Sequence, residues 1–272
     1  MTTPDSDKVF SGSIPKLYER HLVPLIFQPY ADDLAVRVAS APGTRVLEIA
    51  AGTGVVTRAM AGQLPAGVEI VATDLNPAML QEAQAIGAPR MIDWRHADAM
   101  ALPFADAGFD TVVCQFGVMF VPDKPKAFAE ARRVLRPGGR FLFNVWSGLD
   151  ANDIARVVHH AVAALFPADP PAFLARTPYA YFSHDAIARD LAAGGFSAAP
   201  SFDIVPARSR ARSAADAAIG YVQGTPLRSE IEARDATRLA EATDAAARAL
   251  TDAFGPGPID AGILAHVVAV TR

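Results

Sequence analysis

The feature that most constrains the fold is a regular alternation of strand and helix patterns between residues 44 and 147. Short runs of β-branched and other apolar residues alternate with segments of helical patterning. Such alternation is typical of a parallel sheet with helices on both faces. The chain is therefore predicted to be an α/β protein with a doubly wound sheet.

The boundaries of these elements follow from turn and cap signals. Asn76 and Pro77 form a good N-cap and N1 pair, and Gly87 is a good stop. The segment 136–139, Arg-Pro-Gly-Gly, is predicted to end a helix and reverse the chain. Strands are predicted at 45–49, 69–73, 91–96, 110–115 and 140–146, and helices at 53–64, 77–86 and 125–135.

The alternation breaks after residue 147. Helices are expected at 153–166 and 184–193, strands at 202–206 and 262–271, and alanine-rich helix between these two strands. The segments outside the alternation are natural material for a cap over the edge of the sheet where open α/β sheets bind ligands. The expected organisation is a helical lid at 1–40, a ligand-binding core at 41–147, a cap insertion at 148–182, a core helix and strand at 183–207, a helical cap insertion at 208–258 and a final core strand at 259–272.

Composition excludes several classes of protein. The 272 residues are 51% apolar, which is ample for a core, and the net charge is -4 with only four lysines, so nucleic acid is not an expected partner. No apolar run has the length of a membrane span, and Asp5 and Asp7 stand where a signal peptide carries positive charge. A cytoplasmic protein without membrane insertion is predicted. Its oligomeric state is left open.

Four features fall at the carboxyl ends of successive predicted strands. The first is the small-residue loop Ala50-Ala51-Gly52-Thr53-Gly54, preceded by Glu48, where the backbone can approach a ligand closely. The second is Asp74, 22 residues after Gly52, where a carboxylate can accept hydrogen bonds from two ribose hydroxyls.

The third and fourth features follow along the chain. Ala97-Asp98-Ala99 ends the third strand, where a carboxylate can take the exocyclic amine of adenine, and Leu75 and Met79 can sandwich the base. Gln115-Phe116-Gly117 ends the fourth strand, where the reacting end of the ligand should lie. Together the four features predict a nucleoside site.

These residues also carry a resemblance to a family. VLEIAAGTG, TDLNPAML, HADAMALPFADAGFDTVVCQFGVMFVPD and RRVLRPGGRFLFNVW resemble successive motifs of class I S-adenosylmethionine-dependent methyltransferases, and are most similar to the UbiE-like small-molecule branch. The resemblance is dense over residues 44 to 147 and absent from the cap segments. Ala50 departs from it, because the fullest form of the first motif has glycine there. The fold that it implies is a Rossmann-like, seven-stranded, mostly parallel sheet whose last strand is antiparallel.

The resemblance also implies roles for single residues. Glu48 would orient the amino group of the methionine moiety, the loop 50–54 would lie along methionine and ribose, and Asp74 would hold the ribose. Asp98 and Ala99 would bind adenine, and Gln115 would flank the methionine end. Tyr18, within KLYERHLVPLIF, is similar to the helix that closes over the cofactor in this branch, where its ring could face the sulfonium.

The implied function is transfer of a methyl group from S-adenosylmethionine to an oxygen or carbon of a small, partly hydrophobic acceptor, by in-line displacement. The NPPY-like tetrapeptide of amide and ring-amine methyltransferases is absent, since the chain has Gln115-Phe116-Gly117-Val118. No catalytic base is assigned, and the histidines lack the spacing of a zinc site. Cys114 is predicted to be a buried core residue, and the run 208–212, Arg-Ser-Arg-Ala-Arg, a solvated turn more readily than a substrate site.

Two alternatives remain open. An NAD(P)-dependent oxidoreductase is expected to have the motif G-x-G-x-x-G, but Thr57 stands at the third glycine position. A non-catalytic S-adenosylmethionine-binding protein would keep the cofactor site and lack an acceptor pocket. Glu48 disfavours the first alternative, because a carboxylate repels a diphosphate and attracts the ammonium of an amino-acid-bearing nucleoside.

Overall fold

A computed structural model describes residues 5–8, 10–41 and 43–272 of the chain. These residues form two compact units, each assembled from three stretches of sequence. The sheet unit contains Tyr30–Trp146, Tyr181–Val205 and Ala265–Arg272, and the helical unit contains the residues up to Pro29, Ser147–Ala180 and Pro206–Leu264. The last quarter of the expected lid, from Tyr30 onward, therefore belongs to the sheet unit.

One seven-stranded sheet runs through the fold in the order β3-β2-β1-β4-β5-β7-β6. Strands β1 to β5 are parallel neighbours, and β7 pairs with β5 in the antiparallel direction. This confirms the predicted sheet, including its antiparallel last strand. The strands are β1 (Arg45–Glu48), β2 (Glu69–Asp74), β3 (Asp93–His96), β4 (Phe109–Gln115), β5 (Leu135–Trp146), β6 (Ser201–Ala211) and β7 (Ile259–Thr271).

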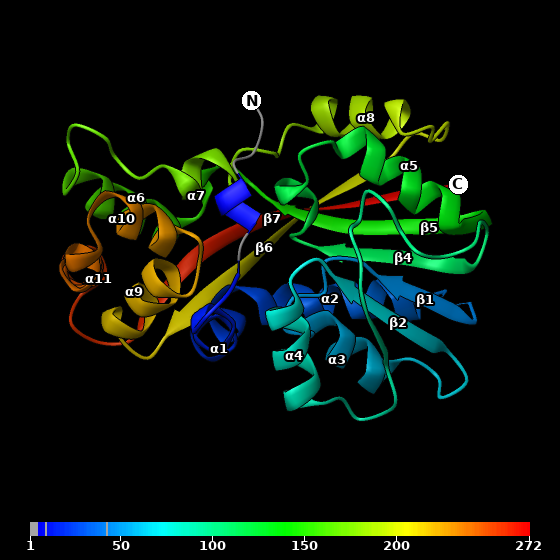
Figure 1. Ribbon diagram of the computed structural model, residues 1–272, viewed down its shortest axis with the longest axis horizontal. Coiled ribbons are helices and arrows are strands. Elements are labelled where there is room, and N and C mark those ends of the chain that lie inside the picture. The colour runs from blue at the N-terminus through cyan, green and yellow to red at the C-terminus, as the bar shows by residue number, and fades with distance from the viewer. Residues whose placement is uncertain (1–4, 9, 42) are drawn as a thin grey trace. The chain divides into compact units, whose positions relative to one another are not determined.

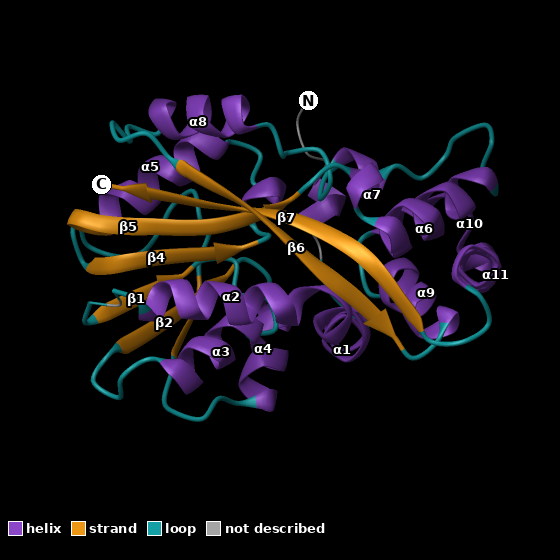
Figure 2. Cartoon of the chain, turned by 180° about the vertical axis from the view of Figure 1, so that it is seen from behind, coloured by secondary structure: helices purple, strands orange, loops and turns teal. Residues whose placement is uncertain are grey.

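Helices cover both faces of the sheet unit. Figure 1 shows α5 and α8 on one face and α2, α3 and α4 on the other, and Figure 2 shows the same layers from behind. The core includes Phe128 of α5 against Phe141 and Phe143 of β5, with ring centroids 5.8 and 5.5 Å apart. The helices of this unit are α2 (Gln28–Ala39), α3 (Val55–Gln63), α4 (Pro77–Ile86), η3 (Val118–Phe120), α5 (Lys124–Val134) and α8 (His184–Ala193).

The predicted turn at 208–212 is wrong, and the one at 136–139 is part of a strand although it follows the end of α5 as expected. The segment 136–139 lies within β5, which begins at Leu135 and reaches regular pairing with β4 through an irregularity in register. The run 208–212 does not form a turn, because β6 continues to Ala211. The guanidinium groups of Arg208 and Arg210 both reach the carboxylate of Asp260 on β7, at 2.6 and 3.3 Å. Neither departure has a local sequence signal, since each is decided by a strand far away in the chain.

The helical unit is built mainly from small side chains. Helix α11 packs against α6 and α9, and buried alanines such as Ala217 and Ala246 permit this close approach. Segment η2 is a π-helix that contains Pro24, which has no N–H to donate. The elements are η1 (Asp5–Lys8), α1 (Ile14–Leu17), η2 (Tyr18–Phe27), η4 (Leu149–Ala151), α6 (Asp153–Ala164), α7 (Phe173–Arg176), α9 (Ala214–Gln223), α10 (Leu227–Asp235), η5 (Ala236–Arg238) and α11 (Leu239–Phe254).

A buried ionic cluster joins three parts of the helical unit. The carboxylate of Asp7, which is fully buried, accepts hydrogen bonds from Arg176 at 2.7 and 2.9 Å and from the hydroxyl of Thr177. Arg176 also donates to Glu230 of α10 at 2.6 Å. The N-terminal segment is therefore fastened to α7 and α10 by one guanidinium group.

Within the described ranges, no helix combines the length and the apolar character needed to cross a membrane.

Candidate nucleoside site

The predicted site residues meet at one edge of the sheet unit. Because β1, β2, β3 and β4 are parallel, their carboxyl ends lie at the same edge. Glu48 is the last residue of β1, Asp74 ends β2, and Gln115 ends β4. Asp98 follows β3 in the next turn. The structure thus brings all four predicted strand-end features together.

The loop after β1 has a strained backbone that leaves little room for side chains. Ala50, Gly52 and Gly54 all have positive φ, at 54°, 58° and 83°. A Cβ atom on Gly54 would lie 2.7 Å from the ring of Trp94, so this position requires glycine. Ala50 adopts the backbone conformation of the glycine that it replaces. A left-handed alanine costs roughly 1–2 kcal/mol, which this loop stores.

Glu48 is a buried acid at the base of this loop. It is 1% exposed and accepts a hydrogen bond from the hydroxyl of Thr57 at 2.5 Å. Burial raises the pKa of Glu48 to about 8, against the opposing effects of the Thr57 hydrogen bond and Arg58. A nearby cation would ionise this group. Thr57 therefore has a function that its place at the third glycine position did not suggest.

The carboxylate of Asp74 already accepts hydrogen bonds from two backbone N–H groups of the protein. Its Oδ2 accepts the N–H of Gly52 at 2.7 Å, and its Oδ1 accepts the N–H of Asn76 at 2.7 Å. Burial nonetheless raises the pKa of the carboxyl, because desolvation outweighs these bonds. An ionised carboxylate offers about four acceptor positions, so roughly two remain for a vicinal diol. The bonds also fix the direction in which those positions point.

The predicted base site has one open and one buried side. Leu75 is 43% exposed, whereas Met79 is 3% exposed, and its Cε lies 3.6 Å from where a Cβ of Gly52 would be. Ala97 is buried and donates its N–H to the carbonyl oxygen of Asp74 at 3.1 Å. Asp98 Oδ1 accepts the N–H of Met100 at 2.8 Å, which leaves Oδ2 to face a ligand. Ala99, between them, is half-buried.

The turn after β4 is held by aromatic packing that the motifs did not reveal. Phe116 has a φ of 50°, and its ring stacks on Trp146 at a centroid distance of 3.7 Å. Tyr30 meets both rings edge-on at 5.4 and 5.3 Å. The N–H of Phe116 donates to the side-chain oxygen of Asn144, the residue paired with Gln115 across the strands. The ring of Phe116 is therefore a packed core group, and its backbone is what the turn presents.

Three further side chains have surroundings that explain them structurally. Tyr18 belongs to the helical unit, where its ring stacks on Phe27 with centroids 4.8 Å apart. His21, also in that unit, has its Nδ1 3.7 Å from Asp216, and burial lowers its pKa. Burial raises the pKa of the Cys114 thiol to about 12, so this cysteine is a core group and no nucleophile. The described residues contain no group of three or more histidine, cysteine, aspartate or glutamate side chains suited to a metal.

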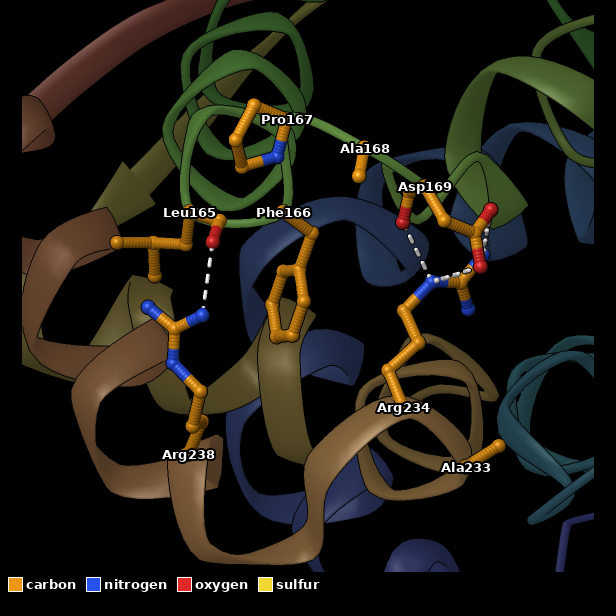
Figure 3. Close-up of a pocket in the computed structure, with 8 residues that line it drawn as sticks. All are labelled: Leu165, Phe166, Pro167, Ala168, Asp169, Ala233, Arg234 and Arg238. Atoms are coloured by element: carbon orange, nitrogen blue, oxygen red, sulfur yellow. Dashed lines mark hydrogen bonds and ion pairs between the residues drawn. The ribbon is translucent and has the colours of Figure 1, made fainter.

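A separate cavity of about 470 Å³ lies within the helical unit (Figure 3). Its two arginines are already paired: Arg234 with Asp169, and Arg238 with the carbonyl oxygen of Leu165 at 2.8 Å. Arg238 also covers the ring of Phe166. None of the predicted nucleoside-site residues lines this cavity, and its charges are satisfied by the protein. The strand-end site, with its buried carboxyl groups, is therefore the better candidate for binding a ligand.

Parts of the chain are similar in sequence to known proteins. Residues 47–143 match the model of a methyltransferase domain family. An uncharacterized protein of Mycobacterium tuberculosis is 40% identical over 127 residues, which are 45% of this chain and 44% of that protein. The ubiquinone/menaquinone biosynthesis C-methyltransferase UbiE of Dinoroseobacter shibae is 42% identical over 122 residues, which are 43% of this chain and 47% of that protein. The chain thus spans less than half the length of these relatives.

Solved structures resemble the fold over its full length. A phosphoethanolamine N-methyltransferase 2 of Haemonchus contortus, in complex with phosphomonomethylethanolamine and S-adenosylhomocysteine, has a TM-score of 0.58 and 18% identity, covering 100% of this chain and 61% of that one. The [4+2]-cyclase SpnF has the same TM-score with 17% identity, covering 100% of this chain and 98% of that one. At these identities the likeness establishes the fold alone, and the two neighbours differ in chemistry.

Proposed function

We propose that this chain moves the methyl group of S-adenosylmethionine to an oxygen or carbon atom of a small, partly hydrophobic molecule, because residues 47–143 match a methyltransferase domain family and part of the chain is similar to UbiE. The observation that carries the proposal is Glu48. A buried carboxyl at the base of a glycine loop suits a cationic ligand, whose charge would ionise it, whereas a diphosphate would gain no such attraction. NAD(P) is disfavoured for that reason.

The cofactor would be held by four groups of residues. Glu48 and the backbone of the loop 50–54 take the methionine end, and Asp74 takes the ribose with the acceptor positions that Gly52 and Asn76 leave free. Leu75, Met79 and the segment 97–99 enclose the base. Gln115 and the backbone of Phe116 flank the reacting end. Tyr18 is kept as a contact of the sulfonium on the strength of the family resemblance alone.

The bound cofactor supplies a methyl group on a positively charged sulfur. The protein's task is then to align the acceptor with that methyl and to exclude water, because the leaving group is neutral and no covalent nucleophile is needed. The thiol of Cys114, with its raised pKa, is consistent with this. An oxygen or carbon acceptor agrees with the absence of the NPPY-like tetrapeptide after β4. UbiE, to which 43% of this chain is similar, is named as a C-methyltransferase of ubiquinone and menaquinone biosynthesis, which favours a carbon acceptor.

Two measurements test the proposal. Calorimetry with S-adenosylmethionine and with NADH should give binding of the first only, and binding of NADH alone would exclude the proposed cofactor. Formation of S-adenosylhomocysteine should then depend on an added acceptor from a panel of phenols, quinones and carboxylates. If the cofactor binds and no acceptor in the panel is methylated, the non-catalytic alternative is favoured. The Asp74→Ala variant serves as a control with weakened cofactor binding.

A further inference from the structure

The connection between β3 and β4 is held by two charged residues of α5. The N–H of Leu102 donates to Glu130 Oε2 at 2.8 Å, and the carbonyl oxygen of Leu102 accepts from Arg133 at 2.9 Å. Arg133 donates to both carboxylate oxygens of Glu130, at 2.7 and 2.8 Å. The ion pair between Glu130 and Arg133 thus forms hydrogen bonds with both the N–H and the carbonyl oxygen of the buried Leu102.

Arg133 makes further hydrogen bonds along the connection between β3 and β4. Its second terminal nitrogen donates to the carbonyl oxygen of Phe104 at 2.7 Å and to Asp106 at 2.8 Å. Its hydrogen bonds to Glu130 and Asp106 raise the pKa of Arg133, and Arg133 lowers the pKa of Glu130, so the pair stays ionised at neutral pH. The contacts use all three guanidinium nitrogens in a fixed fork, which lysine cannot reproduce.

Leu102 lies at the end of the turn that contains Asp98. Asp98 Oδ1 accepts the N–H of Met100 at 2.8 Å, and the carbonyl oxygen of Asp98 accepts the N–H of Ala101 at 2.9 Å. The turn is therefore closed at its start by its own hydrogen bonds and fixed at its end by the ion pair at Leu102. The direction of Asp98 Oδ2 depends on both.

We infer that Glu130 and Arg133 position Asp98 and thereby set the selectivity of the site for an adenine ligand over a 6-oxopurine. The inference rests on the proposed cofactor. The physical reason is that a carboxylate accepts a hydrogen bond from the 6-amino group of adenine but meets the 6-oxygen of hypoxanthine with like charge. Such discrimination requires the carboxylate to be held in place. Glu130 and Arg133 are positioning residues that act through the backbone.

The test compares the affinities of S-adenosylhomocysteine and S-inosylhomocysteine by calorimetry. The unaltered protein should prefer the adenosyl ligand by at least about tenfold, the discrimination expected of one charged hydrogen bond. Arg133→Lys keeps the charge and loses the fork, so this preference should fall several-fold. Glu130→Gln keeps an acceptor for Leu102 and should give a smaller fall in the same direction. Arg132→Lys, the same change at the neighbouring residue of α5, should leave the ratio unchanged.

The ratio separates positioning from stability. Equal weakening of both ligands by the variants at residues 130 and 133, with the ratio intact, would overturn the inference and leave the pair a structural clamp. Equal binding of both ligands by the unaltered protein would also overturn it, while keeping the proposed cofactor. If the unaltered protein binds neither ligand, the proposed function itself fails. Glu130→Gln retains most contacts, so it keeps the test decisive where Arg133→Lys does not fold.

Discussion

Replacing Glu48 by glutamine should change the pH dependence of folding in a calculable way. Glutamine retains an oxygen that can accept the hydroxyl hydrogen bond of Thr57 and removes the titrating group. In the folded chain the pKa of Glu48 is about 8, whereas the ordinary value is 4.5. Between these two values the folded state holds a proton that the unfolded state has released.

This retained proton determines whether the stability of the fold rises or falls with pH. Because the folded pKa is raised, the favourable contribution of Glu48 is complete below pH 4.5 and is lost as pH rises to about 8. The slope is about 1.4 kcal/mol per pH unit, and the whole interval corresponds to about 5 kcal/mol. Above pH 8 the contribution stays constant. Glu48→Gln should therefore stabilise the ligand-free protein increasingly from pH 5 to pH 8.

Urea unfolding of both proteins at one-unit steps from pH 5 to pH 9 measures this effect, with tryptophan fluorescence as the signal. Subtracting the two free energies of unfolding cancels all other titrating groups. The difference should grow with pH and level off above pH 8. A difference that is the same at every pH would refute the raised pKa. The variant should also bind S-adenosylmethionine more weakly, because the ammonium loses its counter-charge.

Three further changes test other parts of the structure. Asp74→Ala should weaken S-adenosylmethionine binding by about 1.5–3 kcal/mol, the value of a charged hydrogen bond, and an unchanged dissociation constant would show that the ribose is held elsewhere. Gly117→Ala should destabilise the fold by about 1–3 kcal/mol, because the new Cβ would lie 2.5 Å from that of Ala50. Adding Ala50→Gly in the same chain should recover part of this loss in urea unfolding; no recovery would contradict the proposed clash. Arg176→Met should cost about 3–5 kcal/mol, since Asp7 is left buried without its cation, and a loss below about 1 kcal/mol would mean that the Arg176–Asp7 ion pair contributes little to the stability of the fold.

Elements bounded by strong local signals were predicted to the residue. Helices α4 and α8 begin and end where expected, because Asn76, Pro77 and Gly87 punctuate the first and Gly194 closes the second. The start of β5 and the end of β6 were not predicted. Both are extended by strands distant in sequence, and Asp260, which binds Arg208 and Arg210, carries no signal that links it to them.

The candidate site was likewise predicted only in part. The strand-end carboxylates were predictable because the parallel sheet brings successive strand ends together. Their surroundings were not. The resemblance marked Ala50 as a departure from glycine, and its φ of 54° shows that the glycine conformation is nevertheless adopted. Thr57, Asn144 and Trp146 act through contacts that only the folded chain makes, so the motifs assigned them no role in the site.

The pairing of β5 with β7 limits when this protein can fold during its synthesis. Arg140 pairs with Thr271 and Trp146 with Ala265, so the outer part of the sheet has no partner until β7 has left the ribosome. Until then, β5 presents an unpaired, apolar edge beside an otherwise formed parallel sheet. A nascent chain is thus most exposed to aggregation, and most dependent on chaperones, while the two helical insertions are being translated.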